Sequence, residues 1–146
     1  MDFGRGIWNY NSFWVWASGN GFLKNGSRFG INLGGGFQDF SVSQATEDSF
    51  FIDGKLNKLN VAQYTYPEEI GEGKWQFKTE KDSIPGSCDI KFEKRNFNLK
   101  EKNFYLFMTR FKQFFGVFSG WVISEEGEKI GFEEIWGVGE VHRTRW

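Results

Sequence analysis

The sequence has 146 residues, the length of one ordinary domain. Its 18 basic and 19 acidic residues leave a net charge of -1, so it lacks the basic excess that a nucleic-acid groove or binding to anionic lipid requires. No apolar run approaches the roughly 20 residues that span a bilayer, and no basic start precedes an apolar segment. We therefore predict a single cytoplasmic domain over residues 1–146, with no nucleic-acid partner and no membrane span.

Aromatic residues and glycines set this composition apart. Phe, Trp and Tyr make up 20% of the chain, and there are 19 glycines against only 2 prolines. Aromatic side chains favour strands and supply large buried area, while glycines favour tight turns. The single cysteine, Cys88, excludes an internal disulfide and a thiolate metal cluster. We expect an all-β protein with no metal and no cofactor.

The first predicted element is a hairpin around the Asn-Gly dipeptide at 25–26, a sequence typical of two-residue hairpin turns. Its strands are expected over Phe13–Lys24 and Ser27–Leu33. In the first strand Trp14 and Trp16 share one face, and the residues beside them are apolar as well. Both faces of this strand should therefore be covered, or one should line a cavity.

A second hairpin is predicted around the Asp-Gly dipeptide at 53–54, between Glu47–Ile52 and Lys55–Tyr64. The three glycines at 34–36 lie between the two hairpins. They lack the spacing and the following helix of a phosphate-binding motif, so we interpret them as a loop or bulge.

The segment Phe104–Phe118 fits the period of a helix and also that of a strand apolar on both faces. Gly116 and the aromatic and β-branched residues through Ile123 favour a long bent strand. The other elements expected in this half are a half-exposed strand at Lys74–Thr79, a turn at Pro85-Gly86, a strand at Ser87–Lys94 with Cys88, Ile90 and Phe92 facing inward, a polar loop over Arg95–Asn103, a turn at Glu126-Gly127, and strands at Lys129–Trp136 and Gly137–Trp146.

These elements sum to about eight to ten strands joined by tight turns, without a βαβ unit. Such a pattern predicts an antiparallel sheet. Closing the sheet into a barrel removes its edges and leaves room for one small ligand. We predict a β-barrel of this kind, with an open β-sandwich as the alternative.

The last strand carries the only histidine of the chain. In extended geometry Glu140, His142 and Thr144 share one face, and Val141 and Arg143 lie on the other with Arg145. A carboxylate two residues from an imidazole can raise its basicity and fix its tautomer, which suits a general acid or base. The alternative interpretation is a structural polar cluster at a barrel mouth.

Several sequence motifs follow one another along the chain. They are Gly4-Arg5-Gly6, Trp14–Gly19, Gly30–Gly34, Glu47, Phe51–Leu56 with Leu59, Phe115–Gly120, and Gly137–His142 through Trp146. In this order they resemble a bacterial family named "domain of unknown function 2804", whose members are about twice this length, so the chain resembles their C-terminal half. The family is distantly similar to two-domain lipocalin-like proteins that include carotenoid hydratases. This resemblance implies a calycin-type barrel but not hydratase activity, because one fold hosts many functions.

The motif residues supply the candidate site. Glu140 and His142 are the candidate catalytic pair, and an arginine such as Arg5 can clamp a carboxylate or orient a water. The candidate ligand-binding residues are Arg5, Trp14, Trp16, Asn32 and Glu47.

Three functions remain open at this point. The first is binding of an apolar or amphipathic small molecule in an aromatic-lined barrel. The second is a lyase or hydratase that uses Glu140 and His142 on an apolar substrate. The third is a structural half-protein that packs on a missing N-terminal partner domain or forms a homodimer, because exposed apolar patches mark interfaces.

Overall fold

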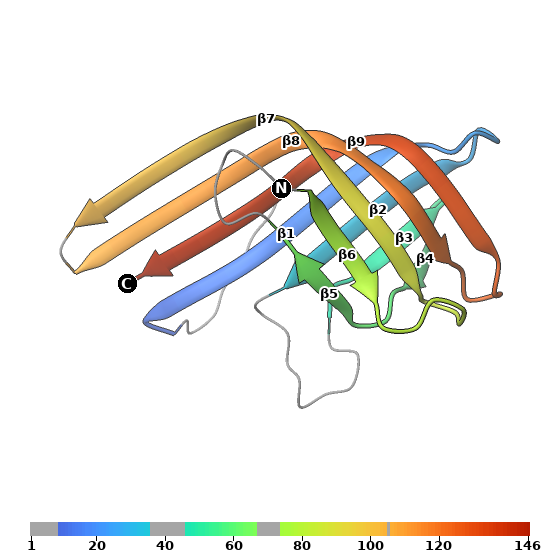
Figure 1. Ribbon diagram of the computed structural model, residues 1–146, viewed down its shortest axis with the longest axis horizontal. Coiled ribbons are helices and arrows are strands. Elements are labelled where there is room, and N and C mark those ends of the chain that lie inside the picture. Colours follow the sequence, from blue (N-terminus) through green and yellow to red (C-terminus); the bar gives the residue numbers. More distant parts are fainter. Residues whose placement is uncertain (1–8, 36–45, 67–73, 105) are drawn as a thin grey trace.

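The computed structural model describes residues 9–35, 46–66, 74–104 and 106–146. Over these residues the chain forms nine strands in one antiparallel sheet and no helix. The strand order is β4-β3-β2-β1-β9-β8-β7-β6-β5, so the first and last strands are neighbours in the middle of the sheet (Figure 1). No helix in the described part of the chain could cross a membrane. The strands are β1 (Asn11–Phe22), β2 (Arg28–Gly35), β3 (Ser49–Ile52), β4 (Lys55–Lys58), β5 (Ala62–Thr65), β6 (Trp75–Thr79), β7 (Cys88–Phe104), β8 (Phe107–Ile123) and β9 (Lys129–Arg145).

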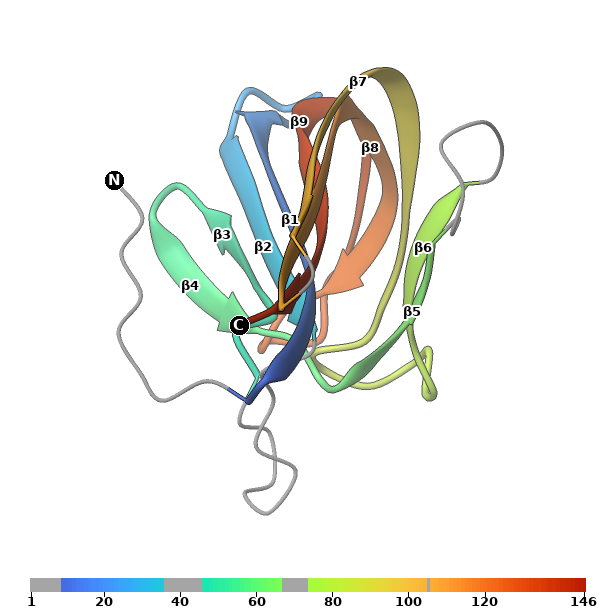
Figure 2. The ribbon, with the colours of Figure 1, turned by 90° about the vertical axis from the view of Figure 1, so that its left-hand side faces the viewer.

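The sheet curls on itself, so that β3 and β4 face β5 and β6 across the interior (Figure 2). The strands at the two edges of the sheet order are β4 and β5. Side chains connect the two sides, because the Tyr64 hydroxyl of β5 lies 2.7 Å from the Gly34 carbonyl oxygen of β2 and 2.5 Å from a carboxylate oxygen of Asp48. The predicted all-β antiparallel fold is confirmed, and the curled half-barrel is consistent with a lipocalin-like barrel.

The concave face of the sheet carries the core, which is built largely from aromatic rings. The Trp75 ring contacts Phe92 and Phe114 edge to face, at centroid distances of 5.8 and 5.4 Å, and Phe92 lies 4.5 Å from Phe118. All four side chains are at most 1% exposed. Burying one such side chain stabilises the fold by about 1.5–3 kcal/mol, so this cluster is a main source of stability.

Glycines permit the bends in the long strands. A Cβ atom on Gly116 would lie 2.1 Å from the Glu93 carbonyl oxygen, and Gly120 has a φ of +142° that other residues rarely adopt. The strand registers shift between Lys94 and Asn96 of β7 and next to Gly120 of β8. Such bulges bend and twist a strand, and here they let β7 and β8 curl around the core.

Most of the predicted elements are confirmed, including both hairpin turns and the long strand expected from Phe104 through Ile123, which begins as β8 at Phe107, because Phe104 is the last residue of β7. Cys88, Ile90 and Phe92 face inward as expected, and burial raises the pKa of the Cys88 thiol to about 12.

Four predictions about these elements are wrong. The expected loop over Arg95–Asn103 is part of β7, because that strand continues past the core and both of its faces are largely exposed there. The strand expected over Lys55–Tyr64 is split into β4 and β5, and the two strands expected after Lys129 are one strand of 17 residues. Gly34 and Gly35 belong to β2, and Gly36 lies outside the described residues.

Candidate functional site

Strands β9, β1 and β2 bring most of the predicted site residues onto one face of the sheet. Trp14 pairs with His142, and Trp16 pairs with Glu140, in the register between β1 and β9. Residues directly opposite each other in an antiparallel pair point to the same face. Since Val15 and Val141 point into the core, these four side chains lie on the convex face.

His142 is half-buried between two aromatic rings. Its ring lies 4.0 Å from that of Trp14 and 5.2 Å from that of Phe111, both in edge-on geometry. The Nε2 atom lies 2.9 Å from the Thr109 hydroxyl oxygen, which can donate or accept according to the tautomer. Burial lowers the pKa of His142 below its usual 6.5, so the imidazole is mainly neutral at pH 7.

Glu140 has a hydrogen-bond partner on the neighbouring strand β8. Its Oε1 accepts a hydrogen bond from Gln113 Nε2 at 2.6 Å, across the β8–β9 pair. His142 and Glu140 share a face, as predicted. The described hydrogen-bond partner of His142 is the Thr109 hydroxyl, and that of Glu140 is the Gln113 amide. The arrangement therefore holds both groups in place without a direct carboxylate–imidazole hydrogen bond among the described contacts.

A second chain of hydrogen bonds crosses from β1 to the segment before β3. Trp16 Nε1 donates to Asn32 Oδ1 at 3.0 Å, and Asn32 Nδ2 donates to Glu47 Oε2 at 3.1 Å. The Glu47 side chain passes over Gly34, where an added Cβ would lie 1.9 Å from Glu47 Oε1. This close approach explains the glycine at position 34.

The convex face thus gathers Trp14, Trp16, Asn32, Glu47, Glu140 and His142, and Arg5 lies outside the described residues. The sequence interpretation had placed Trp14 and Trp16 on a pocket wall. Among the described residues the fully buried tryptophan is Trp75, which the sequence analysis had placed on a half-exposed strand. A strand that is apolar on both faces gives no signal of which face turns inward.

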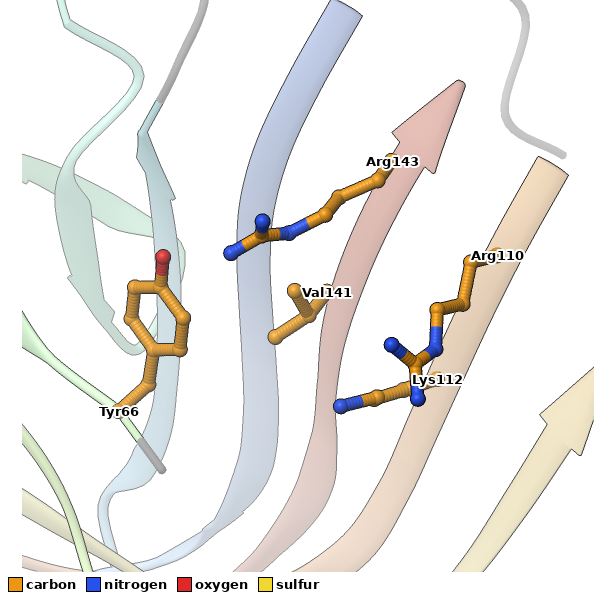
Figure 3. A pocket seen from close by; sticks show the side chains of 5 residues that line it. All are labelled: Tyr66, Arg110, Lys112, Val141 and Arg143. Carbon is orange, nitrogen blue, oxygen red and sulfur yellow. The ribbon is translucent and has the colours of Figure 1, made fainter. Parts of the chain in front are cut away.

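The concave face carries a cavity of about 80 Å³ next to the aromatic core. Its described lining is Tyr66, Arg110, Lys112, Val141 and Arg143. Figure 3 shows the three cationic side chains extending from β8 and β9 toward the side on which Tyr66 lies. Three of the described lining residues carry cationic side chains, and one of these, Arg110, forms an ion pair with Glu101.

Alternation along β8 explains how cations come to lie beside aromatic residues. Phe114, Lys112 and Arg110 occupy successive inward positions, so the concave face changes from apolar to cationic toward the start of the strand. Lys112 is only 6% exposed. Arg110 Nε lies 3.4 Å from a Glu101 carboxylate oxygen, and the Arg143 guanidinium lies 5.1 Å from the Phe13 ring centre.

Sequence reasoning missed Lys112, Arg110 and Tyr66, although it did place Val141 and Arg143 on one face. Once Phe104–Phe118 is accepted as a strand, its alternation puts Arg110, Lys112 and Phe114 together. The contribution of Tyr66 has no local signal, because it depends on the curl of the sheet.

A third polar group lies where the two sides of the curled sheet meet. Asp48 is fully buried and accepts a hydrogen bond from the Gly34 N–H at 2.9 Å. The Tyr64 hydroxyl lies within 2.7 Å of three oxygens, two from Asp48 and one from Gly34, but it has a single hydrogen to donate. Burial raises the pKa of Asp48, and a protonated Asp48 would supply the second hydrogen.

Comparison with known proteins gives one match. A family model described as a domain of unknown function, DUF2804, matches residues 1–146. Neither the curated proteins nor the solved structures contain a match. Because the family model covers the whole sequence, the chain belongs to the DUF2804 family.

Proposed function

We propose that this protein binds an amphipathic small molecule on the concave side of its curled sheet. The observation that carries the proposal is the cavity between Tyr66 and Val141, which opens where the aromatic core ends. Ligand sites in proteins are concave, mostly apolar and equipped with a few convergent polar groups. The cavity shares the concave shape and the combination of apolar and polar groups, because the Tyr66 ring and Val141 adjoin three cationic side chains, but its lining is more polar than is usual for such sites.

On the core side, the wall of this site is formed by packed aromatic rings. Tyr66 stacks on Phe13 at a centroid distance of 5.9 Å and lies 6.0 Å from Trp75. Trp75 in turn packs against Gly139, where an added Cβ would lie 3.3 Å from the indole. These contacts fix the wall that an apolar ligand would meet, and such preorganisation reduces the entropy cost of binding.

A substitution that fills the cavity tests the proposal. Val141→Phe places a larger side chain at the cavity wall, and Val138→Phe is the matched control on the convex face of the same strand. We expect the neutral fluorophore N-phenyl-1-naphthylamine to bind the wild type and the control, and to bind Val141→Phe at least tenfold more weakly.

Native mass spectrometry of freshly purified protein gives an independent readout, because it detects a co-purified small molecule directly. The proposal fails if the wild type carries no small molecule and the fluorophore does not bind. It also fails if the two phenylalanine variants bind the fluorophore equally.

A lyase or hydratase that uses Glu140 and His142 is the second candidate. It is favoured by the convergence of six motif residues on the convex face and by a neutral imidazole that can accept a proton. Any co-purified molecule should then gain or lose one water on incubation with the protein. His142→Asn and Glu140→Gln should abolish that change in mass while binding persists. If both variants retain it, this candidate is wrong.

A structural role as an interface is the third candidate. Trp136 is 63% exposed and Phe115 is 43% exposed, and both lie on the convex face of neighbouring strands. Exposed aromatic residues of this kind are common at protein interfaces. Native mass spectrometry reports the oligomeric state in the same measurement, and Trp136→Ser should convert a dimer into a monomer if this face forms the contact.

A further inference from the structure

We propose that the free end of the β7–β8 hairpin docks on the surface of an anionic lipid bilayer. The feature that carries this proposal is a group of large apolar side chains at that end, each more than half exposed. We name this group the apolar tip, and it consists of Tyr10, Phe104, Leu106, Phe107 and Trp146. The proposal is independent of the ligand cavity and goes beyond the proposed function.

Four strands bring the apolar tip together at one end of the sheet. The end of β7, the beginning of β8, the end of β9 and the beginning of β1 lie side by side there, past the ends of the shorter strands (Figure 1). Phe104 and Phe107 are directly opposite each other in the β7–β8 pair. The Tyr10 hydroxyl donates to the Leu106 carbonyl oxygen at 3.4 Å, and the Trp146 N–H donates to the Tyr10 carbonyl oxygen at 3.0 Å. The five residues therefore lie together rather than as isolated surface residues.

The composition of the apolar tip suits a membrane surface. Trp and Tyr are enriched where a bilayer meets water, because their rings are apolar at one end and polar at the other. Phe and Leu side chains enter the boundary between head groups and acyl chains, and the strength of binding scales with the apolar area that they bury there. Exposed apolar patches on a protein usually mark a surface that contacts something else.

Lysines directly behind the apolar tip supply the charge. Between positions 99 and 110 the chain has three cationic side chains, Lys100, Lys102 and Arg110, and one carboxylate, Glu101. Arg110 and Glu101 form an ion pair with each other. Lys100 and Lys102 are exposed, and both pair with residues of the convex face of β8. The net charge of the whole chain, from which the sequence analysis excluded binding to anionic lipid, does not show this local excess.

The spacing of these lysines matches the depth of a lipid head group. A strand rises by about 3.3 Å per residue, so Lys102 and Lys100 lie about 7 and 13 Å from Phe104 along β7. The polar layer on each side of the hydrocarbon core of a bilayer is about 5–8 Å thick. With the apolar tip at the acyl boundary, Lys102 lies at the level of the phosphates, and the long side chain of Lys100 extends toward them.

A lipid surface fits this end of the sheet better than a protein partner does. Protein interfaces are enriched in aromatic residues but depleted in lysine. Anionic lipid attracts lysine, and each one near the surface favours binding about fivefold. The combination of exposed rings with adjacent lysines therefore favours lipid over a second copy of the chain.

The experiment is cosedimentation of the protein with large vesicles of two compositions, phosphatidylcholine alone and phosphatidylcholine mixed with phosphatidylserine. We expect the vesicles that contain phosphatidylserine to bind at least tenfold more tightly. Their binding should weaken as the salt concentration rises, because salt screens the attraction between exposed lysines and anionic head groups.

Variants locate the contact. Phe107→Ser and Leu106→Ser should each weaken binding about tenfold, because they remove apolar area that enters the bilayer. Phe22→Ser is the matched control, since Phe22 is 69% exposed at the opposite end of β1 from Tyr10. Lys100→Gln and Lys102→Gln should each weaken binding about fivefold. Lys91→Gln is their control, an exposed lysine nearer the beginning of β7.

A fluorescent label reports insertion directly. Leu106→Cys carries the new thiol at the apolar tip, and the native Cys88 is buried and so protected from labelling. An environment-sensitive nitrobenzoxadiazole label at position 106 should brighten on vesicles that contain phosphatidylserine. The same label on Phe22→Cys should not change.

Several outcomes would overturn the proposal. Equal binding to the two vesicle compositions would do so, as would the absence of binding to both. Binding that neither apolar-tip variant weakens would place the contact elsewhere on the molecule. A dimer in native mass spectra that Phe107→Ser dissociates, together with no vesicle binding, would assign the apolar tip to a second copy of the chain.

Discussion

The two faces of the sheet at β8, β9 and β1 use polar groups differently. On the convex face, polar side chains hydrogen-bond one another, as in Gln113 with Glu140 and Trp16 with Asn32. On the concave face, the cavity brings Arg110, Lys112 and Arg143 together. Mutually satisfied polar groups stabilise a sheet. The difference between the two faces is therefore one of space, because the cations of the concave face border a cavity whereas the polar groups of the convex face bond one another.

The largest expected effect is on the free energy of unfolding, because neighbouring side chains on the two faces differ in burial. Phe114 is 1% exposed on the concave face, and its neighbour Phe115 is 43% exposed on the convex face. We expect Phe114→Ala to lower the free energy of unfolding by about 3–5 kcal/mol, because it removes buried surface and leaves a hole. Phe115→Ala should cost about 1 kcal/mol or less. Urea denaturation measures both, and equal losses would contradict the assignment of the faces.

The next effect concerns Asp48, where the two sides of the curled sheet meet. Its raised pKa means that the native state holds a proton more tightly than the unfolded state. The free energy of unfolding therefore falls as pH rises above the ordinary aspartate pKa of 3.8, by at most about 1.4 kcal/mol per pH unit. Asp48→Asn cannot ionise, and its amide can donate to the Tyr64 oxygen. This variant should lack the fall in stability, as measured by urea denaturation across pH.

Asp53→Asn is the matched control for that measurement. A hydrogen bond from the Arg28 backbone N–H lowers the pKa of Asp53, so its contribution is present above the ordinary pKa and is lost as pH falls. The two variants should therefore change the pH profile in opposite directions. If Asp48→Asn is less stable than the wild type at every pH, Asp48 is ionised in the native protein.

A smaller effect is expected for the hydrogen-bond chain of the convex face. Trp16→Phe keeps an aromatic ring but removes the donor to Asn32, and it should lower the free energy of unfolding by about 0.5–1.5 kcal/mol. Trp136→Phe is the control, because Trp136 is 63% exposed. Thermal or urea unfolding of both variants measures the difference, and an unchanged Trp16→Phe would mean that this chain contributes no stability.

The smallest effect is the titration of His142. Burial lowers the pKa of this imidazole, so its contribution to stability is present above the ordinary value of 6.5 and is lost as pH falls through the native pKa. His142→Gln should remove this loss of stability as pH falls below 6.5. The imidazole pKa can also be read directly from its proton resonances by NMR, and a value above 6.5 would contradict the buried environment.

The sequence by itself determined the strands and turns that depend on local chemistry. Glycines at 26 and 54 adopt the positive φ angles that their hairpin turns require. Alternation correctly placed Cys88, Ile90 and Phe92 inward, and it placed His142 and Arg143 on opposite faces. The motifs gave the family, which the match over residues 1–146 bears out. All of these features are encoded within a few neighbouring residues.

Only the tertiary structure decided which face turns inward and which segments meet. Trp14 and Val15 are both apolar, so the burial of Val15 depends on the curl of the whole sheet. The pairing of β1 with β9 and the position of Tyr66 opposite Lys112 join residues far apart in the sequence. Such contacts arise from register and curvature, which many strands set together, and no single stretch of sequence encodes them.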